Sequence, residues 1–138
     1  MSAWTPRKVM EDHATRLTLR RVMKSWPALC TRGFSDDRGA EYKSARDSML
    51  WATLEFRAAI KYLVSGAPGL NKPIENSYVL KHLAERWAFE IPDLNCSYIP
   101  NGVMIAAAIA FGLDVKREPK SGRSNLSINA VINLKGVW

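Results

Sequence analysis

Residues 40–64, AEYKSARDSMLWATLEFRAAIKYLV, carry the strongest periodic signal in the chain. Apolar side chains recur there at spacings of 4, 3, 4, 3 and 4 residues, at Ala45, Met49, Ala52, Phe56, Ala59 and Leu63. This spacing places them on one face of an α-helix. Further apolar residues widen that face, and Trp51 is one of them. We therefore expect one long helix over 40–64 as the centre of the core, with Trp51 buried in it.

Three shorter helices are predicted around this central helix, at about residues 6–25, 77–89 and 102–111. The first begins at Thr5-Pro6, where threonine can cap the helix and proline suits its first position. The last contains the apolar run 103–111, which is typical of a buried core helix and too short to span a bilayer. The segments 27–39 and 65–76 contain glycine and proline and are expected to be loops.

The last quarter of the chain changes to a period of two. Apolar residues alternate with mostly polar ones at Leu126, Ile128, Ala130, Ile132 and Leu134. A second alternating segment begins at Leu113, and the turn-rich residues 119–124 separate the two. This pattern predicts a β-hairpin over 113–134.

The sequence thus predicts a single α+β domain over residues 1–138. It would contain about four helices, three of them packed around the long central helix 40–64, with a C-terminal two-stranded β-hairpin on one side. Its parts would be a basic N-terminal helix and loop (1–34), a helical core (40–111) and the β-hairpin (113–134).

Positive charge is concentrated at the two ends of the chain. The whole chain has a formal net charge of +7, with +5 in residues 1–34, −1 in residues 35–99 and +3 in residues 100–138. Two basic ends on either side of a near-neutral middle indicate an anionic partner, and phosphate is the most common one. We expect a non-enzymatic protein that binds DNA or RNA through the phosphate backbone.

Two groups of basic residues are the candidate nucleic-acid-binding residues. On the predicted first helix, Arg16, Arg20 and Lys24 recur at i, i+4 and i+8 and so form one stripe. Four more lie around the predicted hairpin tip: Lys116, Arg117, Lys120 and Arg123. Each would contact phosphate oxygens. Residues 103–111 offer no donor or acceptor to a base edge, which excludes them as a groove-reading helix.

Other chemistry receives little support from the sequence. No metal site is expected, because Cys30, Cys96, His13 and His82 do not stand at a zinc-ligand spacing. Cys96 with His82 and Asn101 contains the residue types of a thiol nucleophile, but no motif positions them. No cofactor is expected. The N-terminus has no apolar signal segment, so we expect a cytoplasmic protein that does not contact a membrane.

Two stretches, SYVLKHLAE at 77–85 and IPNGVMIAAA at 99–108, are similar to a pattern in small, largely uncharacterised proteins of phages, plasmids and other mobile elements. The resemblance implies either nucleic-acid binding or the binding and blocking of a host machine, as anti-CRISPR proteins do. The alternative function is therefore a protein–protein inhibitor or a subunit of a nucleoprotein machine. Its partner would be a host or phage protein complex.

Overall fold

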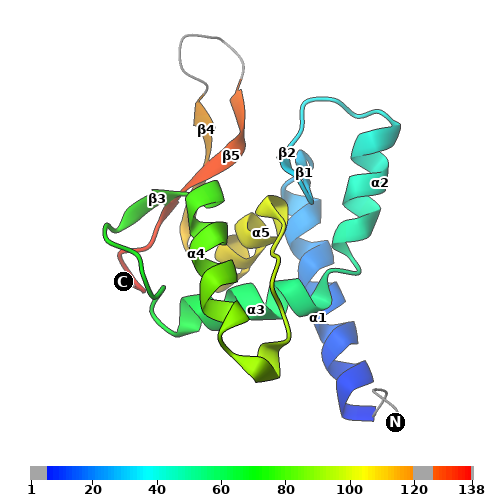
Figure 1. Cartoon of the computed structure of the whole chain (residues 1–138). Coiled ribbons are helices and arrows are strands. Elements are labelled where there is room, and N and C mark those ends of the chain that lie inside the picture. Colours follow the sequence, from blue (N-terminus) through cyan, green and yellow to red (C-terminus); the bar gives the residue numbers. More distant parts are fainter. Residues whose placement is uncertain (1–5, 120–125, 138) are drawn as a thin grey trace.

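A computed structural model of the chain describes residues 6–119 and 126–137 (Figure 1). Its helices are α1 (Pro6–Ser25), α2 (Ala40–Met49), α3 (Thr53–Val64), α4 (Ser77–Phe89), the 3-10 turn η1 (Pro92–Leu94) and α5 (Asn101–Phe111). Its strands are β1 (Leu29–Cys30), β2 (Gly33–Phe34), β3 (Ile74–Asn76), β4 (Asp114–Pro119) and β5 (Leu126–Asn133). The predicted α+β class is confirmed.

The central element of the fold is α5, which contacts α1, α3, α4 and both sheets (Figure 1). Its residues from Asn101 to Ala108 are all buried. A helix without a polar face is stable only when its neighbours cover it on every side, and the apolar sequence of α5 fits that position. The buried helix expected at 103–111 is confirmed, whereas the central place predicted for residues 40–64 is wrong. In the described ranges no helix is long and apolar enough to cross a membrane.

Residues 40–64 form two helices, so the prediction of one long helix is wrong. The N–H groups of Leu50, Trp51 and Ala52 each donate to the carbonyl three residues earlier, which turns the chain between α2 and α3. Met49 and Phe56, on either side of the turn, are both buried. The apolar period therefore continues through the bend, and neither glycine nor proline marks its position.

Tertiary contacts hold α2 and α3 in different directions. Arg46 on α2 donates to four carbonyl oxygens at and beyond the end of α1, those of Met23, Trp26, Pro27 and Leu29. A guanidinium satisfies such terminal carbonyls well, because they lack partners within the helix. These bonds keep α2 beside the end of α1, while α3 packs against α5. One straight helix could not make both sets of contacts.

The C-terminal strands belong to a three-stranded antiparallel sheet in the order β3-β5-β4. The β4–β5 hairpin is confirmed, but the expectation of only two strands is wrong. The third strand, β3, lies in a segment that we expected to be a loop, and its three residues are too short for a periodic signal. Ala130 and Ile132 of β5 are fully buried, as the alternation predicts, whereas Ile128 on the same face is 53% exposed, so the apolar face packs only over the second half of the strand.

The segment 27–39, also expected to be a loop, contains the short hairpin of β1 and β2. This hairpin packs against α5 and β5. Leu29, Cys30 and Phe34 are buried in the process. Its turn, Thr31-Arg32, therefore lies close to the first residues of α5.

Candidate nucleic-acid interface

The basic stripe predicted on the first helix lies along one flank of α1. Arg20 and Lys24 are exposed, and neither makes a hydrogen bond or ion pair with another described residue. Arg16, one turn earlier, is half-buried, and its guanidinium carbon lies 4.8 Å from the centroid of the Trp51 ring. Its Nη1 atom is buried and has no hydrogen-bond partner in the described part of the chain. The ring of Trp51 is thus a main neighbour of this cation.

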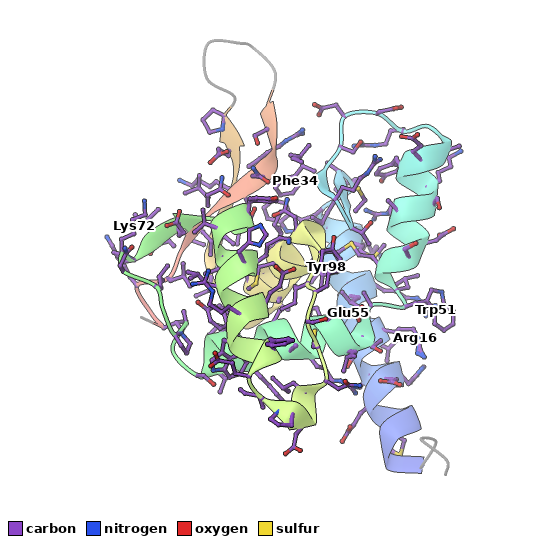
Figure 2. The ribbon with its side chains drawn as sticks, viewed as in Figure 1. Arg16, Phe34, Trp51, Glu55, Lys72 and Tyr98 are labelled. Atoms are coloured by element: carbon purple, nitrogen blue, oxygen red, sulfur yellow. The ribbon has the colours of Figure 1, made fainter. Side chains whose placement is uncertain are left out.

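Trp51 is exposed over 73% of its surface, so the expectation that it belongs to the core is wrong. It lies in the turn between α2 and α3, which directs its side chain outward. Figure 2 shows Trp51 and Arg16 together at one margin of the molecule. An exposed indole next to cationic side chains provides both a surface for base stacking and positive charge for phosphates. Proteins that bind single-stranded nucleic acids use this combination.

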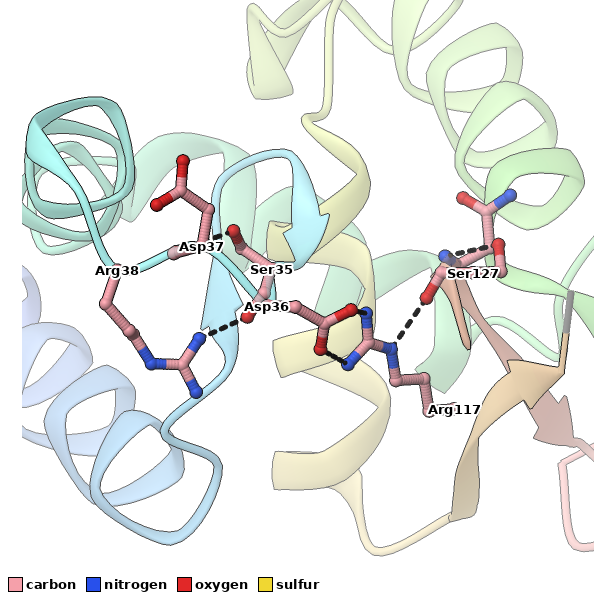
Figure 3. Close-up of polar contacts among 7 residues, drawn as sticks. Ser35, Asp36, Asp37, Arg38, Arg117 and Ser127 are labelled. Atoms are coloured by element: carbon pink, nitrogen blue, oxygen red, sulfur yellow. Dashed lines mark hydrogen bonds and ion pairs between the residues drawn. The ribbon is translucent and has the colours of Figure 1, made fainter. Parts of the chain in front are cut away.

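Arg117 is held by the protein itself. Its guanidinium forms a bidentate ion pair with Asp36, with Nη1–Oδ1 and Nη2–Oδ2 distances of 2.7 and 3.0 Å (Figure 3). Its Nε atom donates to the carbonyl of Ser127 at 2.7 Å, and the ring of Phe34 lies beneath the guanidinium. The Arg117 hydrogen bond holds the pKa of Asp36 below its usual value. This arrangement joins β4 to the residues after β2 and argues against Arg117 as a phosphate contact.

The other predicted hairpin residues divide into two cases. Lys116 on β4 is exposed, with no side-chain partner among the residues described. Lys120 and Arg123 lie outside the described residues, so their contribution stays a prediction. In Figure 1, α5 lies between α1 and the β4–β5 strands. The two elements that carry the predicted basic groups, α1 and β4, therefore lie on different sides of the central helix.

Sequence reasoning missed a cavity of about 670 Å³ between α4, the β1–β2 turn, the segment before α5 and β5. Aromatic and ionisable side chains line much of it: Arg32, Tyr78, Lys81, His82, Glu85 and Tyr98. Thr31, Pro100, Asn101 and Ile128 complete the lining. A concave site that combines apolar surface with a few convergent polar groups is typical of a ligand site.

A buried ion pair forms part of the cavity lining. Lys81 is only 5% exposed, and its Nζ lies 3.0 Å from Oε2 of Glu85. The same carboxylate accepts the N–H of Ile99 at 2.8 Å and lies 3.0 Å from Nδ1 of His82. Three neighbours thus fix Glu85 in one orientation. The signal in the sequence was the i, i+3 and i+4 spacing of these residues on α4.

The turn that carries Arg32 is tied to the first residues of α5. The N–H of Gly102 donates to the Thr31 carbonyl at 2.8 Å, and Nδ2 of Asn101 donates to the Arg32 carbonyl at 3.1 Å. Oδ1 of Asn101 in turn accepts from the hydroxyl of Ser77 at 2.9 Å. The guanidinium of Arg32 has a carboxylate partner in Glu41 at 3.6 Å, an exposed pair of the kind that contributes little energy.

The thiol nucleophile considered from the sequence is not assembled. Cys96 is buried and lies 3.5 Å from the Tyr98 carbonyl, in a hollow different from the one that His82 lines. Burial raises the pKa of the Cys96 thiol, which lowers its reactivity. Asn101 is committed to the structural bonds above. Over the described residues, no group of three His, Cys, Asp or Glu side chains is arranged to hold a metal ion.

No known protein-family model matches the chain, and comparisons with curated proteins and with solved structures gave no significant match.

Proposed function

We propose that this protein binds nucleic acid through phosphate contacts, without catalysing a reaction. Its principal interface would be the α1 flank, which consists of Arg16, Arg20 and Lys24 together with Trp51. The observation that carries this proposal is the exposed Trp51 ring beside Arg16, on the same flank as Arg20 and Lys24. Within the described ranges the two exposed cations have no partner, so their charge is available to an external anion.

Electrostatics favours this interface over an ordinary solvated helix face. Like charges spaced four residues apart oppose each other, and each such pair costs a few tenths of a kcal/mol in an isolated helix. A strand of phosphates would offset that cost and would release its counterions on binding. Arg20 and Lys24 would contact the backbone, while Trp51 would stack on an unpaired base and Arg16 would hold the ring in place.

The test is fluorescence anisotropy with labelled single- and double-stranded DNA and RNA over a series of salt concentrations. We expect binding that weakens steeply as salt rises. The double variant R20E/K24E should weaken binding and lower the slope of log K against log salt by about 2 for duplex DNA, close to one unit for each phosphate that is no longer neutralised. W51A should weaken single-strand binding more than duplex binding.

A matched control is the double variant K72E/K135E. It changes the net charge by the same amount, and both lysines are exposed; because Lys72 also pairs with Glu75 at 3.6 Å, circular dichroism must first show that this variant is folded. Figure 2 places Lys72 on the opposite side of the molecule from Trp51. If both double variants lower affinity equally, overall charge and not the α1 flank governs binding. The absence of binding to every nucleic acid at low salt would overturn the proposal.

One observation favours the alternative function, a protein–protein inhibitor or a subunit of a nucleoprotein machine. Val64 and Phe89 are 69% and 74% exposed, and each lines a hollow that also contains Ile91. Exposed apolar surface of this kind occurs at protein interfaces. The alternative predicts no nucleic-acid binding at low salt, together with a partner complex that F89S disrupts.

A further inference from the structure

The cavity brings together the two stretches that the sequence analysis singled out, residues 77–85 and 99–108. The hydroxyl of Ser77 bonds Asn101, and the carboxylate of Glu85 accepts the N–H of Ile99. Residues 99–108 also contain Gly102, which holds the turn that carries Arg32. These residues are far apart in the sequence, and their polar groups converge on one hollow. The α1 flank uses none of them.

Two tyrosine rings form the aromatic part of the cavity. Nζ of Lys81 lies 5.4 Å from the centroid of the Tyr78 ring and 4.9 Å from that of Tyr98. The protein's own ammonium group therefore occupies the position that a bound cation would take between the rings. Tyr78 and Tyr98 are nonetheless 51% and 61% exposed, so much of each ring is open to a ligand. Aromatic surface of this kind suits a planar, unsaturated group.

The charge of the cavity favours an anionic ligand. The negative charge of Glu85 is balanced by Lys81 at 3.0 Å, which leaves Arg32 as the remaining fixed charge of the lining. The side chain of Arg32 is 57% exposed and only weakly paired with Glu41. Its planar fork of donors matches phosphate oxygens. His82 stands beside Tyr78 with ring centroids 4.6 Å apart, and its Nδ1 is already engaged by the Glu85 carboxylate at 3.0 Å.

We propose that this cavity binds one nucleotide unit, with the base against Tyr78 and Tyr98 and the phosphate at Arg32. The cavity volume of about 670 Å³ lies within the range of small-ligand sites. The ligand could be a free mononucleotide or an unpaired nucleotide within a strand, because both present the same base and phosphate. This site is separate from the α1 flank and does not depend on the function proposed for that flank.

The experiment is an NMR titration of the ¹⁵N-labelled protein with 5′-AMP, 5′-UMP, the two nucleosides and inorganic phosphate, run beside single-strand binding by anisotropy. We expect the mononucleotides to shift the amide signals of residues 31–33, 78–85 and 98–102. R32A should remove the advantage of a mononucleotide over its nucleoside. Y98A should lower the affinity about 5- to 150-fold, the equivalent of about 1–3 kcal/mol of stacking.

Two controls separate ring stacking from general loss of structure. Y98F keeps the ring and should retain binding, whereas F89A removes an exposed aromatic ring outside the cavity and should have no effect. Shifts with mononucleotides identify a free nucleotide as a ligand. Loss of strand affinity in Y98A without such shifts identifies an unpaired nucleotide in a strand.

The cavity proposal is overturned if mononucleotides shift no signal in these three segments and Y98A binds single strands as the wild type does. It is also overturned if inorganic phosphate alone produces the same shifts at the same affinity, because the base then contributes nothing. Neither result bears on the proposal for the α1 flank. If that proposal failed, R20E/K24E would bind nucleic acid as the wild type does, and the NMR titration would be unchanged.

Discussion

Replacing Gly102 by alanine tests how closely the β1–β2 turn packs against α5. A Cβ atom at this position would lie 1.7 Å from the carbonyl oxygen of Cys30, far inside any real contact. The turn would have to retreat until this distance exceeded 3.0 Å. That movement would break the bond from Gly102 to Thr31 and strain the bond from Asn101 to Arg32, now 2.8 and 3.1 Å long.

The expected loss of stability for G102A follows from these contacts. Each hydrogen bond is worth about 1 kcal/mol net, and overpacking of this kind costs about 1–3 kcal/mol. Alanine returns about 1 kcal/mol through its higher helix propensity. The net free energy of unfolding should therefore fall by about 3 kcal/mol, and the melting temperature by about 10 °C in a domain of this size.

The assay is thermal and urea unfolding followed by circular dichroism. G136A is the matched control, because a Cβ at Gly136 would meet no atom within 4 Å. We expect G136A to unfold within about 0.5 kcal/mol of the wild type. If G102A is equally stable, the turn does not pack on α5 as described, and the placement of Arg32 at the cavity is refuted with it.

Two further predictions follow from the ionisable groups. The Arg117 hydrogen bond depresses the pKa of Asp36 below its ordinary 3.8, so the pair should stabilise the fold above that pH and stop doing so as pH falls through the lowered value. The melting temperature of D36N should accordingly lie below that of the wild type at neutral pH and approach it in acid; a difference that persists in acid would contradict this. Burial raises the pKa of the Cys96 thiol, and Cys30 is also buried. Both thiols should therefore react slowly with a thiol reagent in the native protein and rapidly in urea. Rapid labelling of the native protein would show that these residues are not buried.

The helices that have local start and stop signals could be predicted from the sequence. Proline at the start of α1, the Asn76 cap of α4 and Gly112 at the end of α5 mark boundaries that the structure confirms. The bend between α2 and α3 had no such signal, because the apolar period continues through it. Contacts with distant segments determine that bend, namely the Arg46 hydrogen bonds and the packing of α3 on α5, and a pattern read along one segment cannot contain them.

Only the part of the candidate site that lies on a single helix could be predicted from the sequence. The stripe of Arg16, Arg20 and Lys24 follows directly from helical spacing. By contrast, the role of Arg117 depends on Asp36, which is 81 residues away in the sequence. The exposure of Trp51 depends on the same bend that the sequence did not reveal. Spacing within a helix thus predicts which side chains share a face, but not whether another segment covers or engages them.

The buried pair of Lys81 and Glu85 is the strongest reason to regard the cavity as more than a defect of packing. Removing two charges from water is costly, and well-packed apolar side chains of similar size are often as stabilising or more so. Stability alone therefore does not explain why an ammonium group lies under two half-exposed tyrosine rings. A bound group that uses the rings and the nearby Arg32 does explain it, because the pair then holds Tyr78 and Tyr98 in place before the ligand arrives.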